Sequence, residues 1–334
     1  MRYYFSNPQI IMLKIKKLLF TALFFTPQIF FAQYTDVINS NRPGETMSAY
    51  AVGKSVIQAE IGVYGIKEKH DLLDYDATGF GTDLSIRYGA FLEQLEFILD
   101  VQYQMANFDT PYTSYKKNNF RQTVLGAKYL IYDPYKNYKR EANIYSYKAN
   151  HSFKWRELIP AVSIFAGANF VGADNPYYFS PDGEISPKVA LVTQNLFGGG
   201  RWVFVTNIIA DYIGTDYPSY GYVLTLTHGF NARWSGFVEN QGYKSDFYSD
   251  AIVRGGAAYL LSPNMQIDAS ISTNFKNTPS VLYGGVGFSW RYDGWYQSKQ
   301  IEIKNKEKAK KNPENEKPID YQEKERKRKA KYEN

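Results

Sequence analysis

Residues 95–105, LEFILDVQYQM, decide the fold because apolar and polar side chains alternate along them with a period of two. The same alternation returns over residues 265–272 and 282–293, and no convincing helical period appears between residue 53 and the charged C-terminal end. Soluble sandwiches also alternate, but their strands average about 5–6 residues. The strands here reach about 10–12 residues, the length that crosses a bilayer at a tilt. The pattern therefore predicts an all-β, transmembrane, antiparallel up-and-down barrel.

Turn signals divide the barrel region, residues 54–298, into about 12 strands, an even number as in single-chain outer-membrane barrels. Tight connections alternate with longer polar ones, as short periplasmic turns alternate with outer loops. We therefore expect both termini in the periplasm. The long connections are 67–79, 106–119, 172–186, 243–249 and 275–281. The predicted strands are 55–66, 80–91, 94–105, 120–132, 158–171, 187–197, 201–212, 219–229, 232–242, 250–261, 264–274 and 282–293.

One connection breaks this alternation. Residues 133–157 should be a periplasmic turn by their place in the order, yet they are long and rich in Tyr, Lys and Arg. Either they form a functional insertion, which we favour, or they hide a further hairpin around residues 142–147.

The N-terminus has the pattern of an export signal. Lys14, Lys16 and Lys17 precede an apolar run over residues 18–32, which ends in the small residue Ala32. The run has 15 residues, too few for a membrane-spanning helix of about 20. We expect residues 1–32 to be a cleaved signal peptide, with Met12 as an alternative start.

The charge of the chain is concentrated at its ends. Of 39 Lys and Arg, four lie in residues 1–32 and 13 in residues 299–334, where eight of the 33 acids also lie. The region between them holds 22 basic and 25 acidic residues, so the high pI gives no support for nucleic-acid binding. Residues 299–334 are expected to be a disordered, solvated tail.

Closure into a barrel follows from the membrane itself, because every backbone N–H and C=O in hydrocarbon must be paired within the protein. Aromatic side chains prefer the strand ends, at the level of the lipid headgroups. Nine aromatic residues fall near predicted strand ends: Tyr88, Tyr103, Tyr129, Trp202, Tyr220, Trp234, Tyr259, Trp290 and Tyr292.

Ten charged residues fall on the stripe that faces the lumen, and they are the candidates for a solute path. They are Glu60, Asp83, Arg87, Asp100, Lys128, Asp211, Glu239, Arg254, Asp268 and Arg291. Eight strands enclose only side chains and 16–18 enclose a water-filled channel, so twelve leave a narrow or gated lumen and a sealed lumen both open. Residues 33–53 precede the first strand and are a candidate periplasmic plug.

The sequence offers little for catalysis. The chain has no cysteine and three histidines, of which His70 and His151 fall in predicted loops. His228 lies on the predicted lipid-facing stripe, where it could act on a serine such as Ser235. No Gly-x-Ser-x-Gly elbow, metal-ligand spacing or phosphate loop is present. We expect neither an enzyme nor a cofactor or metal.

Two segments carry a family resemblance. Residues 41–46, NRPGET, lead into residues 57–62, IQAEIG, and a second pair is formed by residues 233–239 and 259–268. They resemble the outer-membrane family named for a putative meta-pathway of phenol degradation, with Asn41 where that family usually has Asp. The resemblance covers roughly residues 41–293. It implies an outer-membrane barrel transporter, and the family's name keeps hydrophobic or aromatic solutes among the candidates.

The sequence as a whole predicts an exported barrel in the outer membrane of a Gram-negative bacterium, surrounded by lipid and acting as a passive transporter or channel for small solutes. The alternative is a non-conducting scaffold that docks a periplasmic partner through residues 133–157 or 299–334.

Overall fold

A computed structural model describes residues 37–136, 145–146, 154–172, 175–178, 185–246 and 248–296. The chain divides into a barrel unit, residues 1–294, and a C-terminal unit, residues 295–334. The expected signal peptide and tail, and most of residues 133–157, lie outside the described residues, so their roles stay predictions.

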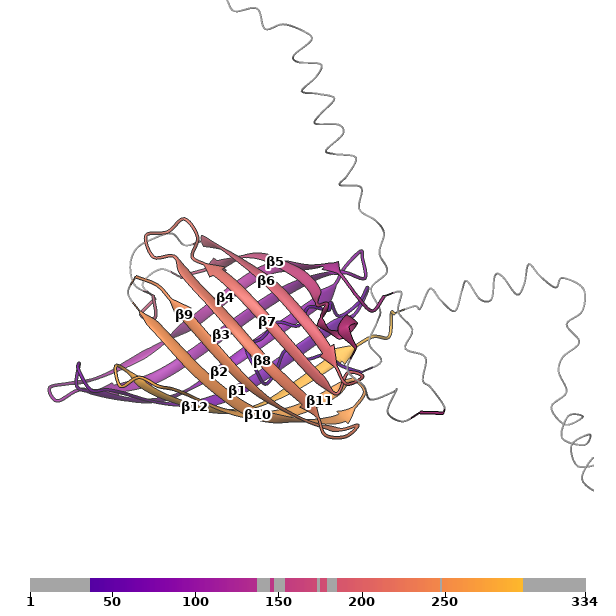
Figure 1. Ribbon diagram of the computed structural model, residues 1–334. Coiled ribbons are helices and arrows are strands. Elements are labelled where there is room, and N and C mark those ends of the chain that lie inside the picture. Colours follow the sequence, from indigo (N-terminus) through magenta and orange to yellow (C-terminus); the bar gives the residue numbers. More distant parts are fainter. Residues whose placement is uncertain are drawn as a thin grey trace, which may run out of the picture. The chain divides into compact units, whose positions relative to one another are not determined.

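Twelve antiparallel strands form one closed barrel in which each strand pairs with its neighbours in sequence and β1 pairs with β12 (Figure 1). The closing pair runs in register from Ile57 opposite Tyr292 to Lys69 opposite Ser280. The strands are β1 Ile57–His70, β2 Tyr75–Gly89, β3 Leu95–Asp109, β4 Ser114–Tyr132, β5 Ala161–Phe170, β6 Ile185–Phe197, β7 Trp202–Asp211, β8 Ser219–Gly229, β9 Trp234–Lys244, β10 Ser249–Ser262, β11 Met265–Asn274 and β12 Ser280–Tyr292.

The predicted number of strands is confirmed, which excludes a further hairpin of the barrel wall at residues 133–157, while a function of this connection stays a prediction. β4 pairs directly with β5 through Val124–Tyr132 and Val162–Asn169, so the barrel wall has no place for another hairpin between them. The described end of this connection carries one turn of 3-10 helix, η1, Trp155–Leu158.

The two long outer loops predicted at residues 67–79 and 106–119 are wrong. Residues 71–74 and 110–113 are all that connect β1 to β2 and β3 to β4, because the strands continue through charged residues that sequence reasoning assigned to loops. The ladder of β1 with β2 runs to His70 opposite Tyr75. Charged side chains above the membrane are solvated while the backbone stays paired, so polarity does not end a strand. These hairpins project beyond their neighbours at the end that we call the loop end (Figure 1).

The outer wall carries apolar side chains and the inner wall carries polar ones. Ile61, Val238 and Ile271 are more than half exposed on the outer face, whereas the most deeply buried side chains include Arg87, Lys128, Glu60 and Glu96. In a soluble protein this distribution would be inverted. A closed barrel with an apolar exterior and a polar interior is the architecture of outer-membrane proteins. Among the described residues, no helix is long and apolar enough to span a bilayer.

Seven of the nine aromatic residues expected at strand ends lie toward the opposite end of the barrel, which we call the short-turn end, while Tyr220 begins β8 at the loop end. Trp202 and Trp234 begin β7 and β9, and Trp290 lies two residues before the end of β12. The rings of Trp234 and Tyr259 are 4.8 Å apart across neighbouring strands. Tyr103 was expected at a strand end and lies instead well inside β3, because that strand continues to Asp109.

Candidate functional site

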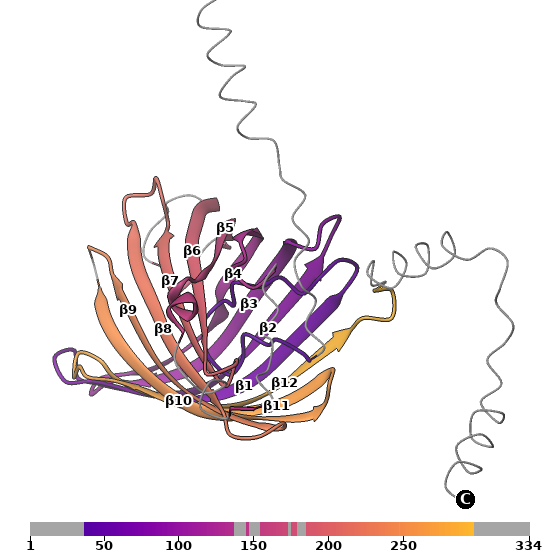
Figure 2. The same cartoon turned by 45° about the vertical axis from the view of Figure 1, so that its right-hand side comes forward.

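The twenty residues before β1 lie inside the barrel, and we call residues 37–56 the lumen segment. The segment enters beside the β10–β11 turn, where the Ile38 N–H donates to the Pro263 carbonyl at 2.7 Å. It leaves beside the β2–β3 turn, where the Ser55 N–H donates to the Gly89 carbonyl at 2.8 Å. Both of its ends therefore lie at the short-turn end, and the part between them bends into the lumen (Figure 2).

The lumen segment makes a polar contact with every strand of the barrel. Most of these contacts join backbone groups of the segment to side chains of the wall, as when Asn207 of β7 accepts from the Met47 N–H at 2.7 Å. Because a non-regular segment cannot pair its own backbone, the wall side chains supply the missing partners. The wall partners, in strand order, are Glu60, Asp83, Glu96, Lys128, Ser163, Gln194, Asn207, Thr225, Glu239, Arg254, Asp268 and Ser289.

The Arg42 side chain lies in a slot made of two glycines and two aspartates. Gly62 and Gly287 face each other on β1 and β12, and Asp83 and Asp268 flank them on β2 and β11. A Cβ atom at either glycine would overlap the guanidinium. The guanidinium pairs with Asp83 and, at 3.3 Å, with Asp268. Burial opposes its charge, but these two carboxylates hold the pKa of Arg42 above its ordinary value.

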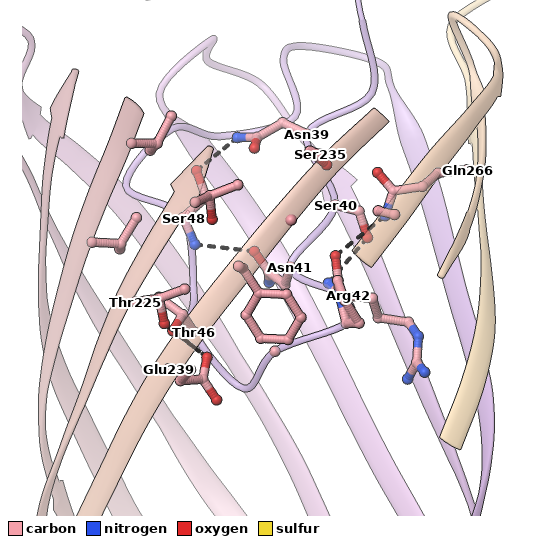
Figure 3. A pocket seen from close by; sticks show the side chains of 18 of the residues that line it. Asn39, Ser40, Asn41, Arg42, Thr46, Ser48, Thr225, Ser235, Glu239 and Gln266 are labelled. Carbon is pink, nitrogen blue, oxygen red and sulfur yellow. Dashed lines mark hydrogen bonds between the residues drawn. The ribbon is translucent and has the colours of Figure 1, made fainter. Parts of the chain in front are cut away.

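Glu239 of β9 receives the next turn of the segment (Figure 3). Its carboxylate accepts the Glu45 N–H at 3.1 Å and the hydroxyls of Thr46 and Thr225 at 2.7 and 2.8 Å. Arg254 of β10 pairs with the same carboxylate and lies 3.8 Å from the Glu45 carboxylate. Burial within the barrel raises the pKa of the Glu45 carboxyl above its ordinary value, against the attraction of Arg254. The Glu45 side chain is still 45% exposed, and it lines a cavity inside the lumen.

A buried cluster anchors residues 50–52, the part of the segment that returns from its bend to the short-turn end. Glu96 pairs with Arg87 at 3.0 Å and with Lys128 at 2.6 Å, and all three side chains have no exposed surface. The Glu96 carboxylate also accepts the Val52 N–H at 2.8 Å. Lys128 donates to the Tyr50 carbonyl at 3.2 Å. Buried charges need such complete pairing, because one missing partner leaves a charge in a medium that solvates it poorly.

The turn at residues 41–44 separates two cavities. A cavity of about 210 Å³ lies on the short-turn side, between the segment and the first residues of β9 and β11. A larger one of about 300 Å³ lies toward the loop end and reaches Tyr243 and Tyr283. Residues 41–44 line both. The segment therefore divides the lumen into an outer compartment, the larger cavity toward the loop end, and an inner compartment, the smaller cavity on the short-turn side.

The ten candidate residues all lie on the inner wall, as the alternation predicts, while their part in a solute path stays a prediction. Seven of them contact the lumen segment or its anchoring cluster, with Glu60 lying 3.6 Å from Arg87. Asp211 pairs with Lys188 at 3.0 Å, Asp100 lines the larger cavity, and Arg291 binds Asn264 at 2.8 Å in the β10–β11 turn. The charged lumen residues that sequence reasoning missed include Arg42, Glu45, Glu96, Arg121 and Lys188.

The pairing of His228 with Ser235 that was considered for catalysis is wrong. Ser235 faces Gly229 across the β8–β9 ladder and lines the smaller cavity. His228 faces Gly236 and packs against Trp202 in a tilted arrangement, with ring centroids 4.0 Å apart. Neighbouring residues of a strand point to opposite faces, so the two side chains lie on opposite sides of the wall. Among the described residues, no cluster of three His, Asp or Glu could hold a metal ion.

Known proteins can now be compared with this barrel. The COG4313 outer membrane channel from Pseudomonas putida F1 aligns with a TM-score of 0.47 and 8% identity, covering 76% of this chain and 100% of that one. The translocator domain of the autotransporter NalP from Neisseria meningitidis aligns with a TM-score of 0.44 and 9% identity, covering 72% and 89%. The KdgM porin aligns with a TM-score of 0.40 and 11% identity, covering 69% and 98%.

No curated protein matches this chain. The family model described as "Putative MetA-pathway of phenol degradation" matches residues 40–292, which include the lumen segment from Ser40 and all twelve strands. The resemblance seen in residues 41–46 and in the paired strands is thereby confirmed. The chain is an outer-membrane β-barrel that belongs to this family.

Proposed function

We propose that this protein is a passive outer-membrane channel for small solutes, and that the lumen segment is its gate. The observation that carries the proposal is the position of residues 41–44, which lie between an outer and an inner cavity of the same lumen. A barrel with a permanently sealed lumen would fill this space with side chains of its own wall, as eight-stranded barrels do.

The way residues 39–46 of the segment are held supports a movable gate. Met47 and Ala49 pack in an apolar cluster with wall residues such as Phe165, so this part of the segment stays fixed. Residues 39–46 contact the wall mainly through hydrogen bonds and ion pairs, such as Ser40 with Glu60 at 2.8 Å and Thr46 with Glu239 at 2.7 Å. Water entering the lumen can replace such polar contacts, whereas it cannot replace apolar packing. Both ends of the segment lie at the short-turn end, so its bend can withdraw in that direction without unthreading the chain.

The proposal is tested by recording currents from the mature chain in a planar bilayer, with and without residues 33–53. Removing the segment leaves the buried pairs of Glu96 with Arg87 and Lys128 within the wall, while Asp83 and Asp268 lose Arg42 and are left to the water of the emptied lumen. We expect a steady current from the shortened barrel and rare or brief openings from the full chain. Silence from both proteins, each shown to be folded by its heat-dependent mobility on a gel, would refute a conducting lumen and favour the scaffold.

A further inference from the structure

A β-bulge in β4 turns one cationic side chain into the outer compartment. Along the β3–β4 ladder Gln122 pairs with Gln102 and Phe120 pairs with Tyr103, which leaves Arg121 as an extra residue. Phe120 is half exposed on the outer wall, while both Arg121 and Gln122 line the larger cavity. Bulges commonly re-aim a side chain near a functional site.

The guanidinium of Arg121 has phenol and amide neighbours instead of a carboxylate. It donates to the Gln104 side-chain oxygen at 3.1 Å and to the Tyr283 hydroxyl at 3.4 Å, and it lies 5.7 Å from the centre of the Tyr283 ring. In the described part of the chain, no carboxylate comes within ion-pair distance of it. The other cations lining this cavity each have a carboxylate partner: Arg42, Lys188 and Arg254.

A second polar group of the same cavity has no partner. The hydroxyl of Tyr64 is buried, and no hydrogen bond to it is found within the described residues. The tip of the Tyr64 ring lies against Gly81, where a Cβ atom would overlap it. It meets the Tyr283 ring edge-on at 6.2 Å, and Tyr283 in turn accepts from Arg121. One cation from β4 and two phenol groups from the neighbouring strands β1 and β12 thus line the same cavity.

The connection between β5 and β6 holds this arrangement in place. Asn175 donates to the Phe120 carbonyl at 2.7 Å, and Tyr178 donates to the Arg121 carbonyl at 2.8 Å. These bonds satisfy the backbone groups that the bulge removes from the ladder. The orientation of Arg121 is therefore supported from both the wall and the connection above it.

We propose that Arg121, Tyr64 and Tyr283 form a binding subsite for a small organic carboxylate with a flat apolar body. A guanidinium without a carboxylate of its own matches a carboxylate ligand, which it can bind through two parallel hydrogen bonds. The phenol hydroxyls add donors for the same group, and the tyrosine rings offer faces for an aromatic ring. The cavity of about 300 Å³ holds a molecule of one ring. The subsite rests on the proposed channel function for its biological role, as the place where an anionic solute first binds.

The test is calorimetric titration of the complete, folded barrel in detergent with benzoate, and separately with acetate and benzyl alcohol. Benzoate carries both the charge and the ring, whereas each of the other probes lacks one of them. We compare the wild type with Arg121→Gln, with Tyr64→Phe, and with Arg233→Gln, which removes the same charge from an exposed turn at the other end of the barrel.

We expect benzoate to bind most tightly, and Arg121→Gln to weaken its binding by about tenfold or more, as for the loss of a charge-assisted hydrogen bond. Tyr64→Phe should weaken it less, and Arg233→Gln should leave it unchanged. Equal benzoate binding by the wild type and Arg121→Gln, or no benzoate binding by the wild type, would overturn the subsite. If Arg121→Gln fails to fold, Tyr64→Phe and Arg121→Lys decide, because both should still lose affinity.

Titration does not require conduction, so the two proposals fail separately. A conducting barrel whose benzoate binding ignores Arg121 would refute the subsite and leave the channel. A silent barrel that binds benzoate through Arg121 would refute the channel and leave the subsite.

Discussion

The replacement Arg42→Gln should open the channel, because it removes the charge that holds the gate to the wall. In the closed state Asp268 has a fully buried side chain, Asp83 is 24% exposed, and Arg42 is 13% exposed. Removing one partner of a fully buried ion pair costs about 3–5 kcal/mol. Because Arg42 and Asp83 are partly exposed, we expect the replacement to destabilise the docked segment by a smaller amount, about 2 kcal/mol. Withdrawal of the segment frees both aspartates to water, so the penalty falls on the closed state alone.

A difference of about 2 kcal/mol corresponds to a change of about 30-fold in an equilibrium. We therefore expect the ratio of open to closed dwell times in single-channel records to rise about 30-fold in Arg42→Gln. The matched control is Lys54→Gln, which removes the same charge from an exposed position of the same segment. A change below about threefold in Arg42→Gln, or an equal change in Lys54→Gln, would refute the role of the slot.

Three further predictions follow from the same geometry. Gly62→Ala fills the slot without changing any charge, so it should also raise the open fraction in bilayer records, whereas Gly65→Ala, whose Cβ has room, should not. Because the pKa of Glu45 is raised in the docked state, protonation favours docking; openings should become rarer as the pH falls from 7 toward the ordinary carboxyl pKa of about 4.3, and Glu45→Gln should remove this dependence. Val238→Lys places a charge on the lipid face and should lower the free energy of unfolding in vesicles by about 2–4 kcal/mol, while Gln241→Lys, on the lumen side, should leave it nearly unchanged.

The barrel wall could be predicted from the sequence because one physical rule acts along its whole length. Hydrocarbon on one side and a polar lumen on the other impose a period of two, and the lumen positions of Glu60, Asp100 and Glu239 follow from it. The extension of β1 to His70 did not follow, since the hairpin above the membrane has water on both faces and its polarity resembles that of a loop.

The gate and the bulge lie beyond the reach of this rule. The lumen segment has no period, and Arg42 meets Asp268 across more than two hundred residues of sequence. Counting back from Lys128 with strict alternation places Arg121 on the lipid face, because one extra residue in a strand exchanges its two faces. A cation predicted on the lipid face was itself a signal of a bulge.

The gate is tested most directly by locking the segment to the wall with a disulfide. The chain has no cysteine, and the hydroxyls of Ser40 and Ser289 lie 2.8 Å apart, so Ser40→Cys with Ser289→Cys places one pair of thiols across the joint between the segment and β12. Single-channel records before and after reduction give the answer, with Ser40→Cys alone as the control. We predict that the oxidised protein shows no openings and that reduction restores those of the wild type. Openings of unchanged size and frequency in the oxidised protein would show that solutes pass without movement of the lumen segment, which would contradict the gate.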